Sequence, residues 1–251
     1  MMLKIAYLGE KFHGFAYQPK MRTVEGDILK ALERIGCTTR VYPASRTDKG
    51  VSVFSNIIRI AFERDNICRI LTALLEDIWA YGYSLEEWNP RHCLKHYIYF
   101  LSCIYKSDDL EKCCTLFSGV HDFSAFTRGK YSNTVREIEV YHEVRGAVTL
   151  LHFKGKSFLW EMIRRCVTGM KMYLSGEKTE QDITLMLEGK SEKIPAAQAE
   201  NLILADLEGG KPFLIDQFSL KRMRKEFYSR YELYTLKKAM FESFLDFHVD
   251  E

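Results

Sequence analysis

The distribution of hydrophobic and polar positions over the first 83 residues predicts four short strands and two helices. A short apolar run over residues 3–8 predicts the first strand, and apolar residues at helical spacing over residues 24–35 predict a helix that Thr23 caps. The other strands are predicted over residues 38–44, 51–62 and 78–83, and a second helix begins at Asp65. The resulting order, β-α-β-β-α-β, is typical of a ferredoxin-like fold.

The remainder of the chain repeats this order of elements without repeating the sequence. Strands are predicted over residues 96–105, 135–144, 147–153 and 202–207, and helices over residues 158–174 and over a segment that begins at Asp108 or Asp109. Two further helices are predicted over residues 179–187 and 219–247. We therefore predict an α+β fold with two ferredoxin-like halves, residues 1–94 and 95–251, whose sheets join around a central cleft and whose helices lie on the outer face.

The composition is that of an ordinary globular protein. Of the 251 residues, 47% are hydrophobic and 28% are charged, which excludes a disordered chain, a collagen-like fibre and a coiled-coil rod. The net charge of +2 indicates no polyanionic partner, so any attraction to nucleic acid has to come from local clusters. Seven cysteines without a Cys-x-x-Cys pair predict reduced, mostly buried thiols in the cytoplasm, and we expect neither a secretory signal nor a membrane-spanning helix.

One loop between two predicted strands holds more charge than a plain turn requires. It runs Ala44-Ser45-Arg46-Thr47-Asp48-Lys49-Gly50-Val51 and includes three charged side chains and a glycine. From the spacing alone, a solvated loop with Asp48 in an Asx-turn before Gly50 is the simpler interpretation. A functional interpretation therefore depends on the motifs that surround this loop.

Motifs on both sides of the loop resemble those of a known enzyme family. Two motifs precede the loop: Tyr7-Leu8-Gly9-Glu10-Lys11-Phe12-His13-Gly14-Phe15 and Thr23-Val24-Glu25-Gly26. Two motifs follow it: Gly119-Val120-His121-Asp122-Phe123-Ser124-Ala125-Phe126 and Gly155-Lys156-Ser157-Phe158-Leu159-Trp160-Glu161-Met162-Ile163-Arg164. Together with Arg46-Thr47-Asp48-Lys49-Gly50-Val51-Ser52, they resemble the TruA-type tRNA pseudouridine synthases, in the variant of archaeal and eukaryotic members. The resemblance extends over most of the chain, from about residue 5 to residue 204.

The resemblance implies an enzyme that isomerises uridine to pseudouridine in tRNA without a cofactor or a metal ion. The catalytic group of the family corresponds to Asp48, whose carboxylate could attack C6 of the base, attack C1′ of the ribose or abstract the C2′ proton; these three routes stay open. Burial in a pocket would raise the pKa of Asp48. By family correspondence, Arg164 in the predicted helix of the second half is the guanidinium that offsets this effect.

The target uracil has to leave the RNA stack to reach a buried carboxylate. By resemblance, Arg46 holds the extruded state and Tyr97 supplies a stacking surface, with Tyr99 on the same face of its strand. Local basic side chains are candidates for RNA binding, with Lys49, Arg128 and Lys156 preferred and Lys130, Lys154, Arg165 and residues 221–225 as further candidates. Several positions depart from the family pattern: Ser45 replaces a glycine of many bacterial members, Ser52 replaces a histidine and Lys95 replaces an arginine. The stretch from Arg91 to Tyr97 is shorter than in bacterial members, and the motif over residues 199–204 lacks the usual proline and glycine.

The family further implies a target in the anticodon stem-loop, around nucleotides 38 to 40, and a homodimer that binds tRNA across both subunits. Two other classes of function are open. A ferredoxin-like sheet could bind single-stranded RNA without catalysis, although the aromatic run typical of such sheets is absent. A small-molecule hydrolase that uses Asp48 with His121 would need a nucleophile–base geometry that the spacing does not support.

Overall fold

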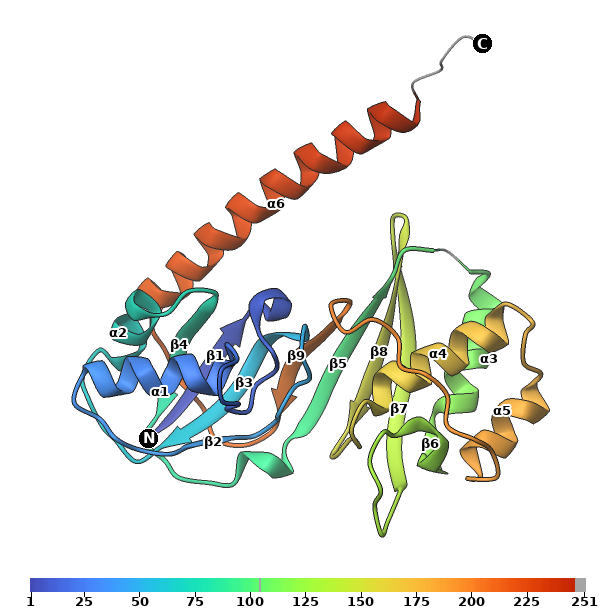
Figure 1. Ribbon diagram of the computed structural model, residues 1–251, viewed down its shortest axis with the longest axis horizontal. Helices are drawn as coiled ribbons and strands as arrows, with labels where there is room; N and C mark the ends of the chain where they lie inside the picture. The colour runs from blue at the N-terminus through green and yellow to red at the C-terminus, as the bar shows by residue number, and fades with distance from the viewer. Residues whose placement is uncertain (104, 247–251) are drawn as a thin grey trace.

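The computed structural model describes residues 1–103 and 105–246, which build one ten-stranded mixed sheet with helices packed against it (Figure 1). The elements of the N-terminal half are β1 (Met2–Tyr7), α1 (Val24–Arg34), β2 (Val41–Pro43), β3 (Ser52–Ile60), α2 (Ile67–Leu74) and β4 (Ile78–Ser84), with the short 3-10 turn η1 (Gly9–Lys11) after β1. Their strands lie in the order β4-β1-β3-β2 and pair antiparallel, as in a ferredoxin-like fold.

The second half repeats this arrangement. Its elements are η2 (Pro90–His92), β5 (Leu94–Leu101), α3 (Ser107–Phe117), β6 (Gly119–Asp122), η3 (Ser124–Phe126), β7 (Val135–Arg145), β8 (Val148–Gly155), α4 (Met162–Leu174), α5 (Glu180–Leu187) and β9 (Leu202–Glu208). The order β9-β5-β8-β7 matches that of the first half, and β6 is added at the edge. The chain continues through β10 (Leu214–Ile215) into the long helix α6 (Gln217–Leu245).

The two sheets join through β3 and β9. These strands pair in parallel over only two positions, Ser52 with Ile203 and Val53 with Leu204, whereas β2 pairs with the other end of β3. This arrangement confirms the predicted α+β fold of two ferredoxin-like halves with joined sheets. The loop that precedes β3 therefore lies at the junction of the halves. The boundary between residues 94 and 95, at the start of β5, stays a prediction.

Several predicted element bounds were wrong. The helix predicted over residues 158–174 begins only at Met162, because Glu161 adopts a left-handed conformation with φ of +61°. Asn66 rather than Asp65 precedes α2, and the strand predicted over residues 96–105 ends at Leu101. The short edge strands β6 and β10 were not predicted. The last helix ends at Leu245, and residue 247 of its predicted range lies outside the described residues.

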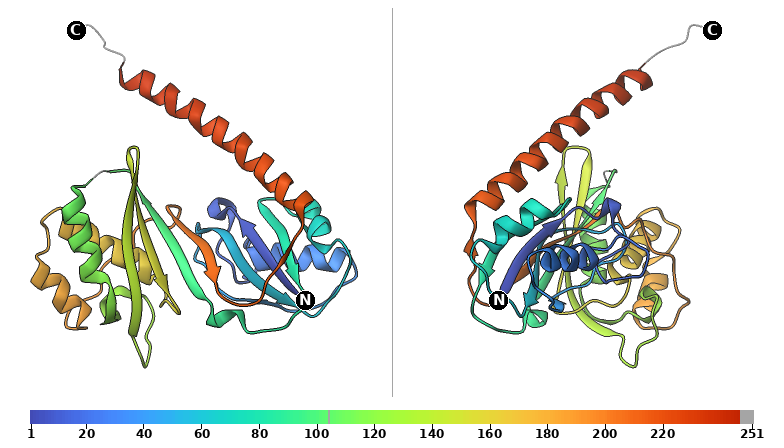
Figure 2. Two further views of the ribbon diagram at one scale, coloured as in Figure 1. Left: turned by 180° about the vertical axis from the view of Figure 1, so that it is seen from behind. Right: turned by 60° about the vertical axis from the view of Figure 1, so that its left-hand side comes forward.

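Helix α6 covers the face of the N-terminal sheet opposite α1 and α2. Met223 packs against Ala6 and Trp79, whereas Ile5 and the other inward residues of β1 belong to the core beneath α1 and α2. Beyond these contacts the helix extends away from the body, as both views in Figure 2 show. Its apolar side chains do not make it a membrane span, since no helix within residues 1–103 and 105–246 has the length and hydropathy to cross a bilayer.

A buried carboxylate fastens α6 to the body. The Asp77 side chain is 2% exposed and is paired with Arg230 of α6, with Lys11 at 3.2 Å and with Arg22 at 3.7 Å. Asp77 is the carboxylate that these three cations share, and each cation also contacts a second one: Lys11 contacts Glu76, Arg22 contacts Asp27 and Arg230 contacts Glu226. Asp77 therefore fixes both the position of α6 and the turn that follows β1.

We expect Asp77→Asn to lower the free energy of unfolding by about 1–3 kcal/mol, the cost of leaving partly buried polar groups without a partner. Asparagine tolerates the left-handed backbone at this position, where φ is +64°, so the variant isolates the loss of charge. Denaturant unfolding and proteolysis within α6 measure the effect. The matched control is Glu76→Gln: within the described residues the exposed Glu76 side chain forms an ion pair with Lys11 alone, so this change should alter stability by less than about 0.5 kcal/mol. Equal stability of the two variants would contradict this role of Asp77.

Candidate active site

A pocket of about 1210 Å³ lies where the two halves meet. Its walls come from the 43–49 loop, residues 13–18, strand β5, and the 157–164 and 196–200 segments. The charged lining residues are Arg46, Lys49, Arg91, Lys95, Arg128 and Arg164 against Asp48, Glu161 and Glu200. With six cations against three carboxylates, the pocket is locally basic although the whole chain is close to neutral.

Buried polar groups fix the loop that holds Asp48. The Asn56 side chain, which is fully buried, accepts a hydrogen bond from the Ser45 amide at 3.2 Å and donates one to the Ser45 carbonyl at 2.8 Å. The hydroxyls of Tyr7 and Thr47 share a hydrogen bond of 2.7 Å, and the Phe15 amide donates to the Thr47 carbonyl at 3.1 Å. Because these contacts lie on both sides of Arg46, the backbone leading to Asp48 has little freedom.

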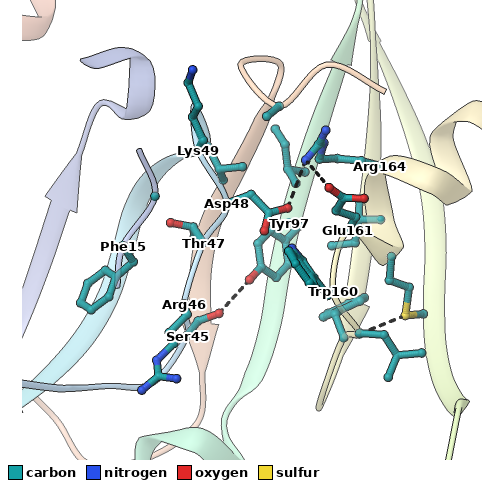
Figure 3. A pocket seen from close by; sticks show the side chains of 18 of the residues that line it. Phe15, Ser45, Arg46, Thr47, Asp48, Lys49, Tyr97, Trp160, Glu161 and Arg164 are labelled. Carbon is teal, nitrogen blue, oxygen red and sulfur yellow. Dashed lines mark hydrogen bonds and ion pairs between the residues drawn. The ribbon is translucent and has the colours of Figure 1, made fainter. Parts of the chain in front are cut away.

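The carboxylate of Asp48 faces a guanidinium from the other half of the molecule (Figure 3). Arg164 Nη1 donates to Asp48 Oδ2 at 3.2 Å, and the two side chains are 15% and 26% exposed, respectively. Arg164 Nε donates to the Ala197 carbonyl at 2.7 Å, which orients the guanidinium toward the pocket. The structure thus brings together the two residues that the resemblance paired, from positions 116 residues apart.

Burial raises the pKa of Asp48 above its ordinary value of 3.8. The charge of Arg164 and its hydrogen bond oppose this rise, the charge of Glu161 adds to it, and a hydrogen bond from Trp160 opposes it. The net direction is upward, so Arg164 offsets the cost of burial only in part. Asp48 is a carboxylate made more basic than usual in a partly enclosed site.

This direction predicts the acid side of the pH–rate profile. If ionised Asp48 is required, activity should fall as the pH decreases through a pKa that lies above 3.8. Single-turnover rates on tRNA across the acid range measure this limb, and assays after return to neutral pH separate titration from acid unfolding. A midpoint at or below the ordinary aspartate value would contradict a partly desolvated catalytic carboxylate.

Glu161 organises the arginines around Asp48 and was not predicted. Its carboxylate lies 2.7 Å from Arg165, 3.5 Å from Arg128 and 3.8 Å from Arg164. Burial acts to raise the pKa of Glu161, but the hydrogen bond and charge of Arg165, with the charges of Arg164 and Arg128, hold this pKa below its ordinary value. The left-handed backbone at Glu161 turns its side chain back toward these arginines, and the apolar pattern of the segment gave no sign of this turn.

Tyr97 lines the pocket, whereas Tyr99 is buried outside it. The Tyr97 hydroxyl shares a hydrogen bond of 2.8 Å with Ser45 Oγ, and its ring meets that of Phe158 edge-on at 5.3 Å. Burial raises the pKa of Tyr97 to about 12, with Ser45 opposing and Asp48 adding to the shift, so the phenol stays neutral. The hydroxyl at position 45, which departs from the bacterial glycine, therefore has a defined partner here.

The remaining predicted residues differ in whether they line the pocket. Arg46, Lys49 and Arg128 line the pocket with exposed side chains. Lys156 does not line it, and its carbonyl accepts a hydrogen bond of 2.8 Å from the buried ammonium of Lys95.

The alternative of a hydrolase that uses Asp48 with His121 finds no support in the structure. His121 is not among the pocket-lining residues. Its Nε2 lies 2.8 Å from the Ser118 carbonyl. The two groups of the supposed nucleophile–base pair are therefore not brought together.

Comparisons with known proteins decide the family. A family model described as tRNA pseudouridine synthase matches residues 113–208. The chain is 38% identical to tRNA pseudouridine synthase A of Pyrococcus furiosus, over 97% of this chain and 96% of that protein. It is 40% identical to the protein of the same name from Pyrococcus horikoshii, over 91% of this chain and 92% of that one. The chain belongs to the TruA-type family of tRNA pseudouridine synthases.

Membership confirms the predicted family and the prediction that this chain is an isomerase. Among solved structures, a chain in a crystal structure of a Cbf5–Nop10–Gar1 complex is similar at 17% identity and a TM-score of 0.36, over 68% of this chain and 44% of that one. That similarity is too slight to support any inference about the site. The roles of individual pocket residues follow from the geometry and are proposals.

Proposed function

We propose that this TruA-type enzyme isomerises uridine in the anticodon stem-loop of tRNA, around nucleotides 38 to 40, with Asp48 as its catalytic residue. The observation that carries the proposal is the ion pair between Asp48 and Arg164, at 3.2 Å, inside the basic pocket between the halves. Of the other two carboxylates that line the pocket, Glu161 is paired with arginines that hold its pKa below the ordinary value, and Glu200 is exposed.

The reaction rearranges bonds within one nucleotide. The N1–C1′ bond breaks, the uracil turns, and a C5–C1′ bond forms, while C5 loses a proton and N1 gains one. A carboxylate with a raised pKa suits a role as nucleophile or as proton acceptor, because basicity assists both. Attack at C6, attack at C1′ and abstraction of the C2′ proton all start from an ionised Asp48.

Binding of an extruded uridine is assigned to three further residues. Tyr97 offers its ring at the wall of the pocket, and Arg164 keeps the carboxylate charged. Arg46 lies two residues before Asp48 with an exposed guanidinium, which suits stacking in the vacated helix position or a bidentate contact with a phosphate. We assign Lys49, Arg128 and Lys156 to the surrounding RNA surface.

Incubation with unmodified tRNA transcripts, followed by nucleoside analysis and position mapping, tests this function. We expect pseudouridine at uridines of the anticodon arm and none in transcripts in which those uridines are replaced by cytidine. Product at other positions would overturn the target assignment. Binding without product for any tRNA would favour a non-catalytic RNA-binding protein.

A cytoplasmic homodimer, which the family resemblance implies, stays a proposal. Sedimentation at working concentration tests the oligomeric state. A monomer that retains full activity would remove the dimer from the mechanism.

A further inference from the structure

Three residues at the mouth of the pocket form a prebuilt aromatic and cationic surface. Trp160 is 47% exposed and Tyr131 is 45% exposed, and both line the pocket with Arg128. The Arg128 guanidinium lies over the Trp160 ring at 4.7 Å from its centroid. Two half-exposed aromatic rings beside a basic pocket offer apolar area on which a planar ligand can stack.

The backbone around Trp160 holds this surface in place. The Trp160 amide donates to the Tyr131 hydroxyl at 3.2 Å, and its carbonyl accepts from the Arg128 amide and from Thr127 Oγ1, both at 3.1 Å. Lys193 Nζ donates to the Gly129 carbonyl at 2.9 Å. The bonds at Trp160 are made by its backbone, so they position the residue without using its indole ring.

Charge at this surface is also prearranged. Arg128 Nη1 lies 3.5 Å from the Glu161 carboxylate, yet its side chain remains 60% exposed. The contact with Glu161 orients the Arg128 guanidinium over one face of the Trp160 ring, and the guanidinium itself remains open to solvent. A phosphate could therefore approach Arg128 while a planar group stacks on the uncovered ring face.

Depth in the pocket distinguishes this surface from the site of the extruded base. Both residues line the pocket, but Tyr97 is only 7% exposed, whereas Trp160 is 47% exposed. When a uracil has entered far enough to contact Asp48 and Tyr97, the half-exposed Trp160 ring remains available to a neighbouring base.

We infer that Trp160 and Arg128 form a second ribonucleotide site, in which Trp160 stacks on the base next to the target uridine and Arg128 contacts that nucleotide's phosphate. This inference rests on the proposed function and adds a second ligand, the neighbouring nucleotide, at the mouth of the pocket. Stacking on an aromatic ring does not discriminate between the four bases, because every base has a π-face. Such a site suits an enzyme that accepts several adjacent uridines in one loop.

Tryptophan fluorescence tests the stacking directly. The chain has three tryptophans, of which Trp79 is buried and Trp88 is partly buried and outside the pocket. Titration of the Asp48→Asn protein with an unmodified tRNA transcript should quench Trp160 emission without turnover. Trp160→Phe in the same background should lose the quench and keep its affinity, since phenylalanine still stacks, whereas the control Trp88→Phe should keep the quench.

Affinity measurements complete the test. Trp160→Leu should weaken tRNA binding by about 5- to 150-fold, the range that loss of one base–aromatic stack produces. A transcript with an abasic residue beside the target should weaken wild-type binding by the same factor and should not weaken binding to Trp160→Leu further. Arg128→Gln should reduce the slope of log affinity against log salt by about 1.

The results separate this inference from the proposed function. The stacking site would be overturned if Trp160→Leu bound tRNA with wild-type affinity, even if pseudouridine forms. It would also be overturned if the abasic transcript weakened binding to Trp160→Leu as much as it weakens binding to the wild type. A quench and a shared abasic effect without any product would keep the stacking site and reject the catalytic proposal. An unchanged unfolding temperature of Trp160→Leu confirms that the affinity loss is local.

Discussion

Asp48→Asn should abolish pseudouridine formation while the protein still folds and binds tRNA. We expect the single-turnover rate to fall by about 10⁴-fold or more, because a positioned proton-transfer group alone supplies about 10²–10⁴ and an amide replaces neither a nucleophile nor a base. The amide is isosteric with the carboxylate, so Arg164 keeps its hydrogen bond to Ala197 and the pocket keeps its shape. Nucleoside analysis after prolonged incubation measures the residual product.

The same substitution should not cost stability at neutral pH. Burial raises the pKa of Asp48 in the folded state, so between its ordinary value of 3.8 and the raised value the folded protein binds more protons than the unfolded chain. The free energy of unfolding therefore decreases as the pH rises through that window, and Asp48→Asn removes this penalty. At pH 7 the variant should unfold at the wild-type temperature or slightly above it.

A matched control separates catalysis from a change of pocket charge. Glu200→Gln also neutralises a carboxylate that lines the pocket, but Glu200 is exposed and forms no ion pair among those found in the described residues. We expect it to retain activity within about tenfold, in keeping with a rim position. Pseudouridine made by Asp48→Asn at a comparable rate would show that another group performs the chemistry.

The topology of this protein was predictable from periodicity because both halves use long, regular strands and helices. The helix over residues 24–34 and the strand over residues 78–84 show their buried faces plainly in sequence. The strands β6 and β10 have only four and two residues, too few to establish a period of two. The partner of β10 is the distant strand β4, so only tertiary context defines β10, whereas β6 pairs with the next strand, β7.

The candidate active site was harder to predict from the sequence than the topology, for a different reason. Spacing alone favoured a plain turn at Asp48, and only the resemblance to a family paired it with Arg164. Glu161 and Trp160 escaped prediction because they lie between Leu159 and Met162, where the apolar pattern suggests a continuing helix. The left-handed residue there interrupts the helix, and it places both side chains at the pocket.

Arg164→Gln should reduce activity at neutral pH and move the acid limb of the pH–rate profile upward. Arg164 is the largest influence that lowers the pKa of Asp48, through both its charge and its hydrogen bond, while burial acts in the opposite direction. An opposite charge at this distance typically lowers the pKa of a carboxyl group by about 1–3 units. Its loss should therefore raise the apparent pKa further, and part of the lost activity should return as the pH is raised.

The neighbouring arginine supplies the control for this prediction. Arg165→Gln removes the same charge from the same helix and also breaks a hydrogen bond to a backbone carbonyl, that of Ile194, but Arg165 forms its ion pair with Glu161 rather than with Asp48. We expect it to cost stability without displacing the acid limb. The activity of Arg164→Lys, and the position of its acid limb, should lie between those of the wild type and Arg164→Gln, because lysine keeps the charge and lacks the planar guanidinium. If Arg164→Gln and Arg165→Gln show the same pH–rate profile, the guanidinium at position 164 does not set the protonation of Asp48, and the pair serves only to hold the two halves together.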